Sequence, residues 1–298
     1  MADIAASVLA RLNNKAKETG RSNQLCMQLF CQEEFLRRLQ QSRYADNLIL
    51  KGGLFIYALT EFDSRITVDI DFLLQNVPNT VEDLRTILDK IITINTGNDY
   101  ISFEITKIEP TRGAIKHVGL SAIIVASIKK TRTTFGIDFG FGDVIVPKQE
   151  KRNIPTQLDG FIEPEVNAYS VETVVAEKLD AILSLMEYSS RMKDYYDILY
   201  ISKRFNFEGK TLCKAIVKTL ANRERDYSSE QVDQLLSLGS DTVMKKKWAA
   251  FLKRIDGDES DFNIVLYEIG VFLRDIVIAA ISDKAFERVW NAESGRWT

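Results

Sequence analysis

The chain has 298 residues, of which 45% are hydrophobic and 27% charged, the composition of a soluble globular protein with one large domain or two modest ones. No apolar run approaches the ~20 residues of a membrane helix, and no signal peptide is visible at the N-terminus, so we expect a cytoplasmic protein that does not contact membranes. The single histidine and three cysteines argue against a zinc site, and the net charge of −3 does not indicate a nucleic-acid binder, although a local basic patch can act within such a total.

All five prolines lie between residues 78 and 164, which favours strands in the middle of the chain and helices at its two ends. Before residue 165, hydrophobic periodicity predicts helices over 3–19, 24–41, 54–59 and 80–95, and strands over 48–50, 66–74, 101–108, 119–129 and 133–140. From Ser170 onward the chain reads as helical: Ser170 is placed to cap a first helix, and further helices are predicted over 193–204, 209–221, 228–237, 241–254 and 259–281. We therefore expect a domain over 1–164 and a helical domain over 165–298.

Two carboxylates stand on the predicted strand 66–74. Asp69 and Asp71 alternate with Ile66, Val68, Ile70 and Phe72, so the acidic pair shares one face and the apolar set shares the other. Carboxylate oxygens are the ligands that Mg²⁺ prefers, so this face is a candidate metal site.

The predicted strand 133–140 repeats this pattern. Phe135, Ile137 and Phe139 form an apolar face, while Asp138 lies between Gly136 and Gly140 on the other face. The glycines leave room for a bulky group to approach, which makes Asp138 a candidate third metal ligand. The alternative is an aspartate at a strand edge beside a turn.

A glycine pair precedes the acidic strand. Lys51-Gly52-Gly53 runs directly into the short helix predicted over 54–59. Free amides at a helix N-terminus favour an anion, and glycines allow a triphosphate to come close to the backbone. The tripeptide is weak evidence alone, but with the acidic strand it predicts phosphoryl or nucleotidyl transfer.

A second set of polar residues lies in the helical half. Lys178 sits within an apolar helix, where it could place an ammonium on a triphosphate or pair with a neighbour such as Asp180. Asp194 and Asp197 share one helix face. Asp194 could cap that helix, orient Lys178, or accept a proton from an attacking hydroxyl.

These motifs in this order resemble the AbiEii-type nucleotidyltransferase toxins of type IV toxin–antitoxin and phage-abortive systems. The resemblance spans about residues 5–205 and rests on four segments: 50–53 (Leu-Lys-Gly-Gly), 65–72 (Arg-Ile-Thr-Val-Asp-Ile-Asp-Phe), 176–181 (Ala-Glu-Lys-Leu-Asp-Ala) and 193–197 (Lys-Asp-Tyr-Tyr-Asp). It implies an α+β, bilobed fold, with a polymerase-β-like nucleotidyltransferase core containing a mixed sheet and a C-terminal helical lobe. It also implies Mg²⁺, an NTP substrate, an RNA acceptor (tRNA for some members) and a cognate antitoxin.

The resemblance also assigns roles to individual residues. Gly52 and Gly53, with Lys51, take the phosphate-loop role, Asp69 and Asp71 the metal role, Lys178 the triphosphate contact and Asp194 catalytic support. Two departures stand out: Gly53 replaces the usual serine of the loop, and Lys193 stands where an arginine is common, with Arg191 two residues earlier.

Three functions are compatible with these residues. The first is a toxin that moves a nucleotide from an NTP to an RNA. The second is a nucleotidyltransferase that modifies a protein or small molecule, and the third is a non-catalytic relic of the fold.

Overall fold

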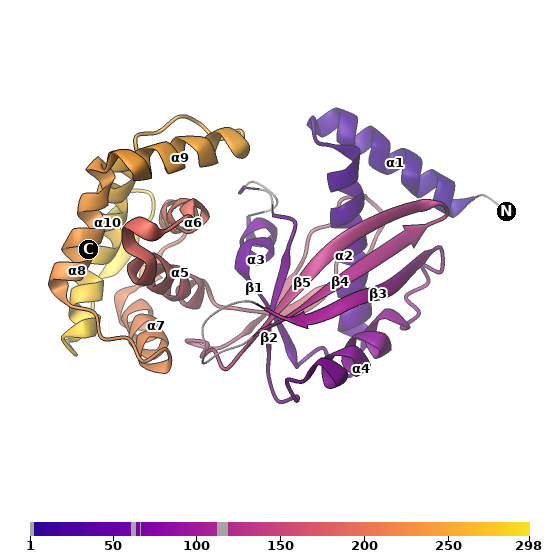
Figure 1. Cartoon of the computed structure of the whole chain (residues 1–298), viewed down its shortest axis with the longest axis horizontal. Helices are drawn as coiled ribbons and strands as arrows, with labels where there is room; N and C mark the ends of the chain where they lie inside the picture. Colours follow the sequence, from indigo (N-terminus) through magenta and orange to yellow (C-terminus); the bar gives the residue numbers. More distant parts are fainter. Residues whose placement is uncertain (1–2, 61–63, 66, 112–118) are drawn as a thin grey trace. The chain divides into compact units, whose positions relative to one another are not determined.

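A computed structural model of the chain describes residues 3–60, 64–65, 67–111 and 119–298. The chain divides into two compact units, Met1–Gly142 with Glu150–Ala168 (unit 1) and Asp143–Gln149 with Tyr169–Thr298 (unit 2). The predicted α+β class is confirmed, because unit 1 is built on a mixed sheet and unit 2 is mainly helical (Figure 1). No helix in the described part of the chain is long and apolar enough to cross a membrane.

Unit 1 combines four helices with seven strands in the residues described. In chain order these are α1 (Ile4–Thr19), α2 (Asn23–Gln41), β1 (Leu48–Lys51), α3 (Gly52–Leu59), β2 (Ile70–Leu74), α4 (Val81–Ile92), β3 (Ile101–Pro110), β4 (Leu120–Ile128), β5 (Thr131–Phe141), β6 (Glu150–Asn153) and β7 (Glu165–Ala168). The sheet order is β3-β4-β5-β2-β1-β7-β6. The β2–β5 and β1–β7 pairs are parallel and the other pairs are antiparallel, so the sheet is mixed, as expected.

Helix α2 covers the apolar face of this sheet. The Phe35 ring lies 6.4 Å from the rings of Phe72 on β2 and Phe135 on β5, and 6.5 Å from that of Phe103 on β3. Side chains alternate across a strand, so Asp71 and Asp138, which neighbour Phe72 and Phe139, point to the opposite face. The core therefore lies under α2 and the acidic residues lie away from it.

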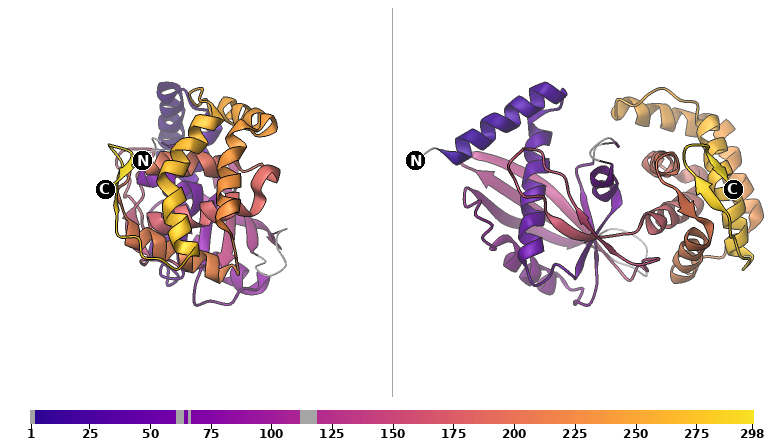
Figure 2. Two further views of the ribbon diagram at one scale, coloured as in Figure 1. Left: turned by 90° about the vertical axis from the view of Figure 1, so that its left-hand side faces the viewer. Right: turned by 180° about the vertical axis from the view of Figure 1, so that it is seen from behind.

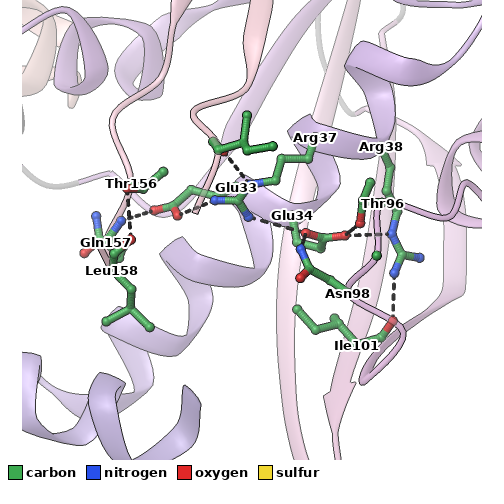
Figure 3. Close-up of polar contacts among 12 residues, drawn as sticks. Glu33, Glu34, Arg37, Arg38, Thr96, Asn98, Ile101, Thr156, Gln157 and Leu158 are labelled. Carbon is green, nitrogen blue, oxygen red and sulfur yellow. Dashed lines mark hydrogen bonds and ion pairs between the residues drawn. The ribbon is translucent and has the colours of Figure 1, made fainter. Parts of the chain in front are cut away.

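Charged side chains on α2 are buried and bonded to the rest of unit 1. Figure 3 shows Glu33 and Arg37 directed at the β6–β7 connection: Glu33 Oε1 accepts a hydrogen bond from the Gln157 amide (2.9 Å), and Arg37 Nε donates to the Ile162 carbonyl (2.7 Å). On the other side Arg38 Nη2 donates to the Ile101 carbonyl (2.8 Å), and Glu34 accepts from Asn98 (2.7 Å). Buried polar groups with such partners fix the rotation of a helix about its axis, because turning the helix would leave them unpaired. Figure 2 shows α1 and α2 from behind, where α1 crosses one end of α2.

Unit 2 is a helical assembly with short strands. Its elements are α5 (Val171–Leu185), η1 (Met186–Tyr188), α6 (Met192–Ser202), β8 (Phe207–Glu208), α7 (Gly209–Asn222), α8 (Ser229–Ser237), η2 (Leu238–Ser240), α9 (Thr242–Arg254), α10 (Phe262–Ile281), β9 (Val289–Asn291) and β10 (Arg296–Trp297). The predicted cap at Ser170 is confirmed, since its hydroxyl accepts the Thr173 amide at 3.3 Å. Trp248 and Trp290 are buried, with indole nitrogens bonded to the Ser260 and Ser202 carbonyls.

The sequence prediction was wrong about the start of the acidic strand and about the short strands. The acidic strand begins at Ile70 and not at 66: residues 67–69 lie outside any strand, Val68 is exposed, and Ile66 lies outside the described residues. Strands β6 to β10 were not predicted. They are two to four residues long, too short for a period-2 pattern to show, and β6 (Glu-Lys-Arg-Asn) carries the charges typical of an edge strand.

Candidate active site

Helix α3 begins directly at the glycine pair. Strand β1 ends at Lys51, and Gly52, with φ +69°, turns the chain into the helix. A Cβ at Gly52 would lie 2.0 Å from Asp71 Oδ2, so a side chain at this position would collide with the carboxylate. Glycine is therefore required at this position both by the backbone and by the contact, and it allows the Asp71 carboxylate to rest against the first turn of α3.

Three charged residues form a row across neighbouring strands. In the ladders Lys51 on β1 is opposite Asp71 on β2, and Asp71 is opposite Asp138 on β5. Directly opposed residues share a face of a sheet with Cβ atoms about 5 Å apart, so an ammonium and two carboxylates stand side by side. Asp138 is exposed and Lys51 and Asp71 are half-buried, so solvent and ligands reach this row.

Asp69 approaches the same face from outside the ladder. Its Oδ1 lies 3.9 Å from the place that a Cβ on Gly136 would occupy, and Gly136 is two residues before Asp138. The glycine predicted to leave room on β5 therefore leaves it beside Asp69. Nearby, Thr67 Oγ1 lies 2.9 Å from the position of a Cβ on Gly53, so Thr67 places a hydroxyl against the residue that replaces the loop serine.

The ligand atoms on this face are of the type that a hard divalent cation prefers. Asp69, Asp71 and Asp138 provide carboxylate oxygens, which suit Mg²⁺ and Mn²⁺ and do not suit soft metals. Across the described residues, no three acidic, histidine or cysteine side chains are drawn together closely enough to form a ready metal cluster. The metal role of these aspartates stays a prediction.

In unit 2, Lys178 is buried between two aspartates of α6. Its Nζ donates to Asp194 Oδ1 at 3.0 Å and to Asp197 Oδ2 at 2.6 Å. Lys178 is 8% exposed, and Asp194 and Asp197 are 0% and 1% exposed. Of the alternatives open from sequence, the contact between Asp194 and Lys178 is present.

Asp180 instead belongs to a separate ion group in unit 2. Its two carboxylate oxygens accept from Arg223 Nη1 (2.8 Å) and Arg225 Nε (3.0 Å), and Arg223 also lies 3.4 Å from Asp143 and from Glu177. The surrounding carboxylates raise the pKa of Arg223 against the opposing effect of its burial. This group connects α5 to the segment that follows α7 and to the 143–149 segment, which indicates a structural role.

Asp194 remains ionised in spite of its burial. Burial by itself raises the pKa of Asp194, but the charges and hydrogen bonds of Lys178 and Arg191 outweigh it and hold the pKa below the ordinary value. Arg191 Nε bonds to Asp194 Oδ2, so a guanidinium contacts the aspartate although Lys193 occupies the position where arginine was expected.

Sequence reasoning missed several residues at these sites. Asp197 was seen on the face of Asp194 but was not assigned to the site, and its i, i+3 spacing was the available signal. Gln28 and Gln32, which bond to the backbone beside Asp69, gave no signal, because their partner lies 36 or more residues away. The structure thus brings together Lys51, Gly52, Asp71 and Asp138 in unit 1, and Lys178 and Asp194 in unit 2.

The chain is similar to one known protein family and to solved structures. The family model described as the nucleotidyl transferase AbiEii toxin of type IV toxin–antitoxin systems matches residues 34–291. No curated protein matches the chain. Among solved structures, JHP933 from Helicobacter pylori is similar at 16% identity and a TM-score of 0.44, over 85% of this chain and 93% of that one. A candidate nucleotidyltransferase from H. pylori is similar at 15% identity and a TM-score of 0.44, over 85% and 96%.

Proposed function

Because this chain belongs to the AbiEii nucleotidyl transferase toxin family of type IV toxin–antitoxin systems, we propose that it moves a nucleotide from an NTP to an RNA acceptor, tRNA being the expected class, in a Mg²⁺-dependent reaction. The family makes the chain a toxin-type nucleotidyltransferase with an NTP substrate and an antitoxin partner. Mg²⁺-dependent transfer to RNA is supported above all by one observation, the row of Lys51, Asp71 and Asp138 at the first turn of α3.

In this proposal the residues of unit 1 bind the triphosphate and the metal. The amides at the start of α3 receive phosphate oxygens, and the missing side chains of Gly52 and Gly53 allow that approach. Lys51 adds a positive charge beside Asp71. Asp69, Asp71 and Asp138 would hold Mg²⁺, which when bound stabilises the negative charge on the attacking and leaving oxygens.

The residues of unit 2 supply a positioned ammonium. Asp194 and Asp197 hold Lys178 Nζ from two sides, which restricts it to one location. An ammonium held in place costs no reorganisation when pyrophosphate departs, so Lys178 is proposed as the triphosphate contact and Asp194 as its positioning residue.

Transfer to RNA is tested with labelled nucleotides. The protein is incubated with each α-³²P-labelled NTP, Mg²⁺ and total cell RNA, and the RNA, protein and small-molecule fractions are then separated. We expect label on RNA and its loss when Mg²⁺ is chelated. The label should also be lost in Asp71→Asn but not in the matched Asp89→Asn variant, at an exposed position of α4. Label on protein or on a small compound would show that this molecule, and not RNA, is the acceptor. Absence of label in every fraction would refute the proposal.

A further inference from the structure

Two glutamine side chains of α2 donate hydrogen bonds to the same backbone carbonyl. Gln28 Nε2 and Gln32 Nε2 each donate a hydrogen bond of 2.7 Å to the carbonyl oxygen of Val68. The glutamines are four residues apart and so share one helix face. A carbonyl oxygen can accept two hydrogen bonds, so this pair, here called the glutamine clamp, satisfies the Val68 carbonyl completely.

The glutamine clamp lies on a helix whose rotation is restrained by hydrogen bonds to the rest of unit 1. Gln32 is 1% exposed and directly precedes Glu33, whose carboxylate is tied to the Gln157 amide. Glu34, Arg37 and Arg38 fasten the following turn to two other segments of unit 1, as Figure 3 shows. Because α2 cannot rotate without breaking these bonds, the two amides point at a fixed place.

Residues 67–69, which the glutamine clamp holds, lie outside the described strands. Strand β2 begins only at Ile70, so the ladder does not hold residues 67–69. The Val68 side chain is 42% exposed and gains little from burial. Yet this segment carries Thr67, against Gly53, and Asp69, beside Gly136.

We infer that Gln28 and Gln32 are positioning residues that set the place of the Asp69 carboxylate through the Val68–Asp69 peptide. The inference rests on the proposed function for the role of Asp69. A peptide unit is planar, so fixing its carbonyl oxygen also fixes the direction in which the chain enters Asp69. Amide donors suit this task because they are uncharged: a lysine or arginine at the same place would pair with Asp69 and compete with a cation.

The test compares Gln28→Leu and Gln32→Leu with Gln24→Leu, the same change one turn earlier on the exposed part of α2. Mn²⁺ binding is measured by titration in the presence of a non-transferable NTP analogue. Loss of one hydrogen bond on the clamp should raise the Kd for Mn²⁺ by about 3- to 10-fold. The KM for NTP should change less than the Kd for Mn²⁺, and Gln24→Leu should match the wild type.

Hydrogen exchange provides a readout that needs no catalysis. Amides of the peptide covering residues 67–72 should exchange faster in both clamp variants and at the wild-type rate in Gln24→Leu. Gln32→Glu keeps the size of the side chain but presents an acceptor to the carbonyl, so it should show the same defects. If Gln32→Leu does not fold, Gln28→Leu decides, because Gln28 is only half-buried.

Two results would overturn the inference: clamp variants that bind Mn²⁺ as tightly as Gln24→Leu, or unchanged exchange over residues 67–72. Failure of the proposed function has a different signature. A wild-type protein that labels no RNA would remove that function, while the Mn²⁺ titrations and exchange rates would still report on the clamp.

Discussion

Replacing Lys178 with methionine should unfold the helical unit more easily. The change keeps the length of the side chain but removes the ammonium from between Asp194 and Asp197, which are 0% and 1% exposed. Arg191 still contacts Asp194, so that carboxylate keeps one of its two cationic partners. Removing one partner of a buried ion pair costs about 3–5 kcal/mol, which corresponds to a fall in Tm of roughly 10 °C.

The assay uses the distribution of tryptophan in the chain. All three tryptophans, Trp248, Trp290 and Trp297, lie in unit 2, so urea unfolding followed by their fluorescence reports on that unit. The control is Arg274→Met, which removes a cation from an exposed pair with Asp233 in the same unit. Exposed pairs contribute little to stability, so the control should unfold close to the wild type.

The pH dependence provides a second check on the reasoning. In wild type the lowered pKa of Asp194 contributes stability above about 3.8, its ordinary pKa, and that stability is lost as the pH falls through the folded-state pKa. In Lys178→Met, Asp194 keeps its burial but loses the charge and hydrogen bond of Lys178, so its folded-state pKa should rise and the variant should lose stability relative to the wild type as the pH rises through that pKa. The loss of unfolding free energy should therefore be larger at pH 7 than at pH 4. The buried ion group would be refuted as the cause if Lys178→Met lost no more unfolding free energy than Arg274→Met. It would also be refuted if the loss were the same at both pH values.

Three further predictions concern unit 1. Gly52→Ala should inactivate the protein. In the control Gly20→Ala, the residue has a similar positive φ but open space around it, so the change should cost only about 1–2 kcal/mol of backbone strain. Transfer activity and thermal unfolding, measured on both variants, separate loss of the site from loss of stability. Burial raises the pKa of Glu33 to about 8 against the opposing charge of Arg37, so the folded state retains a proton and stability should fall between pH 4.5 and 8. Glu33→Gln should flatten this slope in unfolding curves followed by circular dichroism, and an unchanged slope would contradict it. Asp138→Asn should lower the transfer rate by about 100-fold or more with the fold intact, and a rate within twofold of wild type would exclude Asp138 from the site.

Local patterns in the sequence predicted most of the long elements. The alternation of Phe135, Ile137 and Phe139 with Asp138 predicted both the strand and the face of its carboxylate, because alternation is a property of one strand and needs no partner. Ser170 could be read as a cap for the same reason, since its hydroxyl bonds to an amide three residues later. The order of the glycine pair, the acidic strand, Lys178 and Asp194 was sufficient to indicate a nucleotidyltransferase of this family.

Only the tertiary structure decided which of these residues meet. Lys51, Asp71 and Asp138 form one row because of the register between three strands, two of which lie more than 60 residues apart in the chain. Lys178 bonds to Asp194 and Asp197 on another helix, and Asp180, close to it in sequence, bonds to Arg223. Contacts between distant segments also decide that β2 begins at Ile70. The same holds for the hydrogen bonds from Gln28 and Gln32 to the Val68 carbonyl. Periodicity records which side of an element is apolar, whereas register and ion pairing depend on how separate elements pack, and a single sequence does not encode that as a local pattern.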